Sequence, residues 1–372
     1  MIPFTNMNAY TNFMLQKLFI SAFLVSAGFL LPARAQDAAE APATISQKKV
    51  SLGKASPFTD SLQAKVSGIA IVNAVWDTSR IGFLQTGLFN NKAEAIPDKE
   101  MGQYLQEYVN NTFGGVFTPG KPRLIWVVED LRIGERTQMM GEKAYVRVKA
   151  TAYVQAGEDT YKLLKVMDIV HLNNGFDVTH QHRNNISNAF KEFYTAGIDT
   201  IDAVLADTQP GLSYAGITDV YAKKRELPAL KAPVMNDGVY LSFASFLENK
   251  PDILQFETKG KAGKVKVYAI PGDGQKTIIP ALWGMVKNGA VFKYTNKSLI
   301  ELSRSGHGYV ITSYLSAYER RQTAIIGGAL IGGVAGGLLG STTALQHTDA
   351  FPELKLPAEA TAIDMETGAL IF

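Results

Sequence analysis

Hydrophobic positions in the first half of the chain follow both strand and helix periods. Nearly continuous apolar runs at residues 68–76 and 124–128 predict two buried strands. Between them, apolar side chains recur every three and four residues, which predicts one face of an amphipathic helix that ends at Gly114-Gly115. These side chains are Met101, Tyr104, Leu105, Tyr108, Val109 and Phe113.

Residues 145–155 alternate strictly between apolar and polar side chains, which predicts a strand with one face in the core and one in water. The side chains predicted to face water are Tyr145, Arg147, Lys149, Thr151, Tyr153 and Gln155. Gly157-Glu158-Asp159 predicts a hairpin turn into a strand at 161–172. A second helix follows, with an apolar side made of Ile186, Phe190, Phe193, Ile201 and Val204. The order β-α-β-β-β-α predicts an antiparallel-rich sheet with two helices, in a domain spanning 59–207.

The second half of the chain has a different pattern. Residues 208–235 combine a Pro-Gly pair, a charged stretch and two further prolines, and predict a linker. Residues 236–372 predict a β-rich domain, a meander or partly open barrel. Its strand candidates are 239–243, 253–257, 265–270, 282–286, 291–294 and 308–312. Asn288-Gly289 predicts a type I′ hairpin turn, and residues 364–372 predict a turn and a last strand. The predicted fold class is therefore α+β.

The N-terminal segment has the pattern of a secretory signal peptide. Lys17 precedes an apolar stretch at 18–31, and an A-x-A site ends at Ala35. This stretch is short for a membrane span, which favours cleavage after Ala35 and assigns residues 1–35 to the signal. Translation starts at Met1 or Met14, because the first charge is Lys17. Residues 36–58, rich in Ala, Ser, Lys and Pro, predict a flexible leader.

Composition excludes several classes of function. The chain has no cysteine, which excludes disulfides, thiolate metal sites, cysteine nucleophiles and a lipidated cysteine after the signal. Its net charge is only +3, from 37 basic and 34 acidic residues, so nucleic acid is not an expected partner. Hydrophobic residues make up 46% and charged residues 19%, which indicates apolar surface that meets a partner.

The most specific motif is a glycine repeat at residues 324–340, a segment made only of Ala, Ile, Leu, Val and Gly. On a helix, glycines four residues apart form a flat stripe that lets a second helix approach closely. The stripe consists of Gly328, Gly332, Gly336 and Gly340, with Gly333 and Gly337 beside it. Glycine costs about 1 kcal/mol per position in a helix in water, so this segment requires a lipid or protein environment.

Four arrangements of this glycine zipper are open. As a single span it would leave Arg320-Arg321 on the non-cytoplasmic side, against the positive-inside tendency. Self-association in an oligomer or a hairpin that dips into a membrane avoids this conflict. The fourth arrangement is a glycine-rich segment buried against the β-rich domain.

Three histidines, His171, His180 and His182, lie within 12 residues and are the weak candidates for a metal site. On a helix the side chains of His180 and His182 diverge, and two further ligands are not evident, so the start of a surface helix is the favoured interpretation. No metal, other cofactor or catalytic residue is predicted.

Charged residues near strand ends are the other candidates. Asp77 with Arg80, and Glu129 and Asp130 with Arg132, lie where clefts can form, but surface ion pairs are the commoner explanation. A periplasmic hydrolase or a small-molecule-binding protein, with a site between the two domains, would use Glu129, Asp130 or the histidines.

Two partial resemblances follow from these patterns. Residues 69–77, 124–133 and 145–155 resemble periplasmic auxiliary domains of envelope and transport lipoproteins, without the lipidated cysteine. Residues 236–243, Trp283-Gly284 and 364–368 are similar to uncharacterised secreted Gram-negative envelope proteins. The resemblance implies a location in the periplasm or at the outer membrane, and it implies no activity.

The expected function is therefore that of a non-catalytic cell-envelope protein for binding or assembly. It is expected to associate with itself or with another envelope protein, or to contact a membrane, through residues 324–340. The alternatives are the periplasmic hydrolase and the small-molecule-binding protein.

Overall fold

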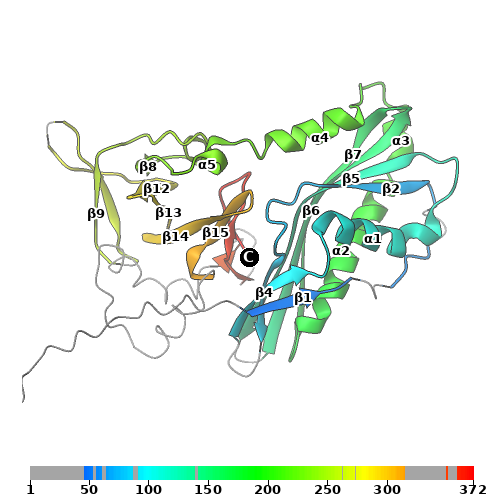
Figure 1. The fold of residues 1–372 in the computed structure, drawn as a ribbon, viewed down its shortest axis with the longest axis horizontal. Helices are drawn as coiled ribbons and strands as arrows, with labels where there is room; N and C mark the ends of the chain where they lie inside the picture. Colours follow the sequence, from blue (N-terminus) through cyan, green and yellow to red (C-terminus); the bar gives the residue numbers. More distant parts are fainter. Residues whose placement is uncertain are drawn as a thin grey trace, which may run out of the picture. The chain divides into compact units, whose positions relative to one another are not determined.

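The computed structural model describes residues 46–52, 56–60, 64–86, 91–138, 141–261, 263–272, 274–314, 349–350 and 358–372 (Figure 1). All of them belong to one compact unit, Pro42–Phe372. The fold is mixed α+β, as predicted, and none of the sheets formed by these residues is closed into a barrel. The cleavage site at Ala35 and the glycine zipper at 324–340 lie outside the described residues.

A seven-stranded central sheet contains most of the first half of the chain. Its strands, in spatial order, are β1 (Ser46–Val50), β4 (Asn91–Pro97), β3 (Gly82–Thr86), β5 (Arg123–Gln138), β6 (Gly141–Gly157) and β7 (Thr160–Gly175), and β2 (Gly68–Asn73) pairs with β5 off this path. Strands β5, β6 and β7 form a long antiparallel meander, and the Glu158-Asp159 turn joins β6 to β7 as predicted. Strand β1 pairs in parallel with β4, so the expectation of a flexible leader is wrong for Ser46–Val50.

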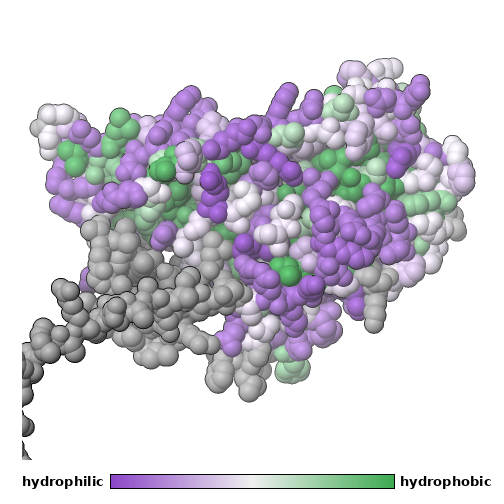
Figure 2. Space-filling view, in the orientation of Figure 1, coloured by the Kyte–Doolittle hydropathy of each residue, from purple (hydrophilic) through white to green (hydrophobic). Residues whose placement is uncertain are grey.

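Two amphipathic helices, α1 (Met101–Phe113) and α2 (His182–Ile198), cover one face of this sheet (Figure 1). Helix α1 has the predicted bounds, since the carboxylate of Glu100 accepts from the first backbone N–H groups and Gly114 follows its last turn. Its predicted apolar face is buried with Trp126 and Phe190 in an aromatic core. The outward surfaces of both helices are hydrophilic (Figure 2). The second predicted helix is interrupted, because its last apolar residues belong to α3 (Ile201–Ala206).

The second half of the chain forms an antiparallel seven-stranded sheet. Its strands, in spatial order, are β19 (Leu370–Ile371), β18 (Ala362–Ile363), β15 (Gly308–Ile311), β14 (Ser298–Ser305), β13 (Ala290–Thr295), β12 (Gly284–Lys287) and β8 (Gly238–Tyr240). Asn288 and Gly289 have φ values of 53° and 76°, which confirms the predicted type I′ turn between β12 and β13. The predicted turn and last strand at 364–372 are also present.

Smaller elements complete the described structure. Helices α4 (Tyr214–Lys223) and α5 (Pro228–Lys231) lie within the predicted linker, and α6 (Phe243–Leu247) replaces the end of a predicted strand. The smaller sheets contain β9 (Phe256–Lys259), β10 (Lys266–Ala269) and β11 (Thr277–Ile278), and β16 (Asp349–Ala350) with β17 (Ala358–Glu359).

The face of β6 that was predicted to lie in water is mostly buried, with only Lys149 and Gln155 half-buried. Tyr145, Arg147 and Thr151 are only 1–3% exposed, because residues of the C-terminal strands and of α4 pack over them. Alternation along one strand shows which side chains share a face, but it does not show that a distant segment covers the polar face. This covered polar face contains the candidate site.

Candidate functional site

A buried cluster of charged side chains lies on the face of the central sheet opposite α1 and α2. Arg147, in the middle of β6, is 3% exposed and contacts three carboxylates. Its Nη2 lies 2.6 Å from Oδ2 of Asp364, and its Nη1 lies 3.1 Å from Oδ2 of Asp130. Its Nε and Nη2 both donate to Asp168 on β7. Because Asp364 lies in the turn between β18 and β19, this cluster joins the middle of the central sheet to the C-terminal strands.

Burial and charge act in opposite directions on these carboxyl groups. Burial raises the pKa of Asp130 to about 6, although Arg147 and Arg132 favour its ionised form. Burial also opposes ionisation of Asp364, but the charge and hydrogen bonds of Arg147 outweigh it and lower the pKa of that carboxyl. Oδ1 of Asp130 has no hydrogen-bond partner among the described residues. The cluster therefore contains a carboxyl group that titrates in a mildly acidic range while shielded from water.

Arg132 on β5 forms a second buried link to the C-terminal strands. Its Nε donates to the oxygen of Phe372, and its Nη2 donates to Oγ1 of Thr361 at 2.8 Å. The guanidinium carbon lies 4.9 Å from the ring centre of Trp76. The expected surface location of these charged residues is wrong, since Asp77, Asp130 and Arg132 are only 1–4% exposed. The expected pairing of Asp77 with Arg80 is present, with Nε of Arg80 3.1 Å from Oδ2 of Asp77.

Beside this cluster lies a cavity of about 310 Å³, which we call the junction pocket. It is bounded by β5 and β6 of the central sheet, by α4 and the residues after it, and by the turn at Asp364. Apolar atoms make up most of the surface exposed in it, although eight of its fourteen lining residues are charged residues or histidine. The apolar and aromatic contributors are Ala74, Trp76, Tyr221, Leu227, Leu247 and Met365. A cavity with a mainly apolar surface and polar groups that fix the orientation of a ligand is the usual form of a small-molecule site.

Most charged side chains of the junction pocket are paired with one another. Nζ of Lys224 lies 2.7 Å from Oε2 of Glu129 and 2.5 Å from Oε1 of Glu366. Lys149 contacts the other oxygen of Glu366. Asp130 and Asp364 both contact Arg147. Every acidic side chain that lines the pocket therefore has a basic partner.

Arg225 and His307 are different. Nη2 of Arg225 donates to the backbone oxygens of Asn73 at 3.0 Å and Val75 at 3.4 Å, and no carboxylate among the described residues pairs with this guanidinium. His307 lies in the tight turn between β14 and β15, where its backbone N–H donates to the oxygen of Trp76 at 2.7 Å. Partial burial and the nearby charge of Arg225 lower the pKa of His307. The junction pocket thus contains a cation without a counterion and, near it, an imidazole that can donate a hydrogen bond.

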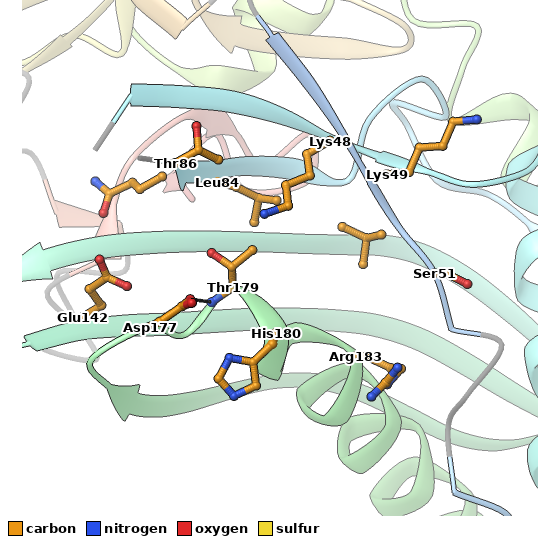
Figure 3. A pocket seen from close by; sticks show the side chains of 12 residues that line it. Lys48, Lys49, Ser51, Leu84, Thr86, Glu142, Asp177, Thr179, His180 and Arg183 are labelled. Atoms are coloured by element: carbon orange, nitrogen blue, oxygen red, sulfur yellow. Dashed lines mark hydrogen bonds between the residues drawn. The ribbon is translucent and has the colours of Figure 1, made fainter. Parts of the chain in front are cut away.

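A second cavity, of about 600 Å³, lies beside β1 and β3 of the central sheet, and we call it the strand groove (Figure 3). Strand β1 supplies Lys48 and Lys49, the segment that leads into α2 supplies Thr179 and His180, and the first turn of α2 supplies Arg183. Unlike the junction pocket, the strand groove has a mainly polar lining. The two cavities share no lining residue.

The structure does not bring the three histidines of the sequence together. Nε2 of His171 lies 3.0 Å from Glu192, whereas His182 is fully buried with its Nε2 2.9 Å from Oε1 of Glu135. His180 is exposed in the strand groove. Among the residues that the structure describes, no group of three or more His, Asp or Glu side chains could hold a metal ion.

Comparisons of the chain with protein-family models, with curated proteins and with solved structures find no match. No helix formed by the described residues is both long and apolar enough to cross a membrane.

Part of the junction pocket was predictable from the sequence. Glu129 and Asp130, named as candidates for a site between the two halves, do line it. Trp76, Arg225 and His307 were not predicted as members of one site, because they are far apart in the chain. The charged run at residues 223–226 contained the only local signal for Arg225.

Proposed function

We propose that this protein is an exported, non-catalytic binding protein of the cell envelope that takes a small organic anion with an apolar body into the junction pocket. This proposal rests on one observation: the guanidinium of Arg225 has no carboxylate partner among the described residues and lies beside the apolar side chains of the pocket. A carboxylate on the ligand would pair with Arg225 and accept from His307. The apolar part of the ligand would cover Leu247 and Met365.

The geometry favours binding over hydrolysis. A general acid or base must come within about 3 Å of the reacting group, directly or through one water. Asp130 is 4% exposed and Arg147 contacts its Oδ2, while Lys224 contacts Glu129. The two carboxyl groups that a hydrolase would use in the junction pocket are therefore engaged in ion pairs.

The rest of the proposal concerns location and assembly. We propose that the chain is cleaved after Ala35 and resides in the periplasm or at the outer membrane. We also propose that it has two domains, at 59–207 and 236–372, joined by 208–235. Residues 324–340 would mediate self-association, contact with another envelope protein or contact with a membrane. The support is the signal-peptide pattern and the four-residue glycine spacing.

Ligand binding is tested by titrating the purified mature protein with octanoate and phenylacetate, and with phenylacetamide as the neutral counterpart. We expect a carboxylate to bind, the amide to bind at least tenfold more weakly, and Arg225→Gln to weaken carboxylate binding at least tenfold. Arg123→Gln, an exposed arginine on β5 outside the pocket, is the matched control. Equal affinity for acid and amide, or failure of both carboxylates to bind, contradicts the proposed ligand class.

Assembly is tested separately with Gly332→Leu combined with Gly336→Leu. We expect this variant to lose oligomer size on chromatography and retention in carbonate-washed membranes of the native host, because leucine side chains would separate the helices. An unchanged size with and without detergent contradicts the assembly proposal and leaves the ligand proposal intact.

A further inference from the structure

The strand groove shares no lining residue with the junction pocket. Its basic side chains outnumber its acidic ones. Lys48, Lys49 and Arg183 have no ion-pair partner among the described residues. The two carboxylates of the groove are engaged by backbone instead. Oε2 of Glu142 accepts from the N–H of Val178 at 3.4 Å, and Oδ1 of Asp177 accepts from the N–H of Thr179 at 3.2 Å.

Arg183 gives the strongest indication that the groove binds an anion. It stands in the first turn of α2 and is partly buried, and its Nε is shielded from water without a hydrogen-bond partner among the described residues. A shielded guanidinium N–H without an acceptor is costly. An anion in the groove that bound the guanidinium would offset part of this cost by pairing with its charge.

Figure 3 shows how the cations are arranged. Lys48 extends from β1 over the groove, whereas His180 and Arg183 come from the opposite side, on the segment that enters α2. Thr179 lies between Lys48 and His180, and Lys49 points to the other side of β1 from Lys48. Lys48 and Arg183 therefore line the same cavity from two sides, one on β1 and the other on α2.

We propose that the strand groove binds a phosphorylated sugar, with the phosphate between Lys48 and Arg183. Phosphate matches the planar fork of an arginine and the point charge of a lysine. The polar lining and the volume of about 600 Å³ suit a hydroxyl-rich body larger than the phosphate itself. The sugar phosphate could be a soluble molecule or the headgroup of a glycolipid, since both present the same chemistry. This site does not depend on the proposed function of the junction pocket.

The test uses the full mature protein and three soluble probes, glucose 1-phosphate, glucose and inorganic phosphate, in isothermal titration calorimetry at low salt. A separate sedimentation assay uses vesicles that contain a phosphorylated glycolipid, compared with vesicles of neutral lipid. The variants are Lys48→Gln, Arg183→Gln and Arg183→Lys. Lys121→Gln, an exposed lysine outside the groove, is the matched control.

We expect glucose 1-phosphate to bind more tightly than glucose or phosphate alone. Lys48→Gln and Arg183→Gln should each weaken binding about tenfold, and Arg183→Lys should retain part of the affinity. Binding only to the glycolipid vesicles, with the same dependence on the variants, supports the same site with a lipid-linked source. The proposal is overturned if neither glucose 1-phosphate nor the glycolipid vesicles bind, or if the groove variants bind as well as Lys121→Gln does while melting at the wild-type temperature.

Discussion

Arg147 and Asp364 are 217 residues apart in the chain, yet Nη2 of Arg147 donates to Oδ2 of Asp364 at 2.6 Å in a buried site. This contact fastens the turn between β18 and β19 to the middle of the central sheet. Asp364 also lines the junction pocket. The integrity of this ion cluster should therefore affect both stability and ligand binding.

Removing the shared arginine should be more damaging than removing one of its acids. Arg147→Met leaves Asp130 and Asp364 buried without their ion-pair partner, and we expect a loss of about 4 kcal/mol in the free energy of unfolding. Asp364→Asn leaves Arg147 with two carboxylates and should cost about 2 kcal/mol. Urea denaturation measures both values, with Lys121→Gln as the surface control. Equal losses for the two buried variants would show that the carboxylates do not share one cation as described.

Asp130 should make stability depend on pH. Its pKa is about 6 in the folded protein and about 4 in an unfolded chain, so the folded state binds more protons between these values. Its contribution to stability is fully present below about pH 4 and is lost as the pH rises through about 6. Relative to Asp130→Asn, the wild-type protein should therefore lose roughly 2–3 kcal/mol between pH 4 and pH 7.

This pH effect is measured by urea unfolding of the wild-type protein and of Asp130→Asn at four pH values from 4 to 7. The lowered pKa of Asp364 acts in both proteins, so to first order it cancels in the difference. A difference that is constant across this range contradicts the raised pKa of Asp130.

Close packing against Trp76 should make Gly308 intolerant of any side chain. A Cβ at Gly308 would lie 2.2 Å from Cε3 of the indole, whereas a Cβ at Gly68, also in a strand, meets nothing within 4 Å. We expect Gly308→Ala to lower the stability by about 2 kcal/mol or more and Gly68→Ala to change it by less than about 1 kcal/mol. Thermal unfolding compares the two variants, and similar melting temperatures would refute this packing.

The β12–β13 turn should depend on the left-handed backbone of Gly289. Its φ is 76°, and a Cβ there would make an ordinary contact of 3.6 Å with Val234, so the cost of Gly289→Ala is conformational rather than steric. We expect a loss of about 1 kcal/mol in chemical denaturation. Gly272→Ala, at an open position without a positive φ, serves as the control.

The sequence alone determined the elements whose signals are local. The period of three and four at 101–113 specified α1, because one turn of a helix brings those side chains onto a single face. Asn288-Gly289 specified a hairpin, because these residues tolerate positive φ. The α+β class followed from such local patterns, whereas no strand was predicted at β1, β3 or β4 and no helix at α4, α5 or α6.

Only the tertiary structure decided which polar residues form sites. Arg147 and Lys149 occupy the polar face of an alternating strand, and periodicity alone indicates water on that face. The C-terminal residues cover it instead, since Asp364 and Phe372 meet Arg147 and Arg132 across more than 200 positions of sequence. Likewise, Arg225 reaches the junction pocket because α4 packs on Tyr153 and Val127. The local sequence determines which side chains share a face of each element. Long-range packing determines which of these faces are buried.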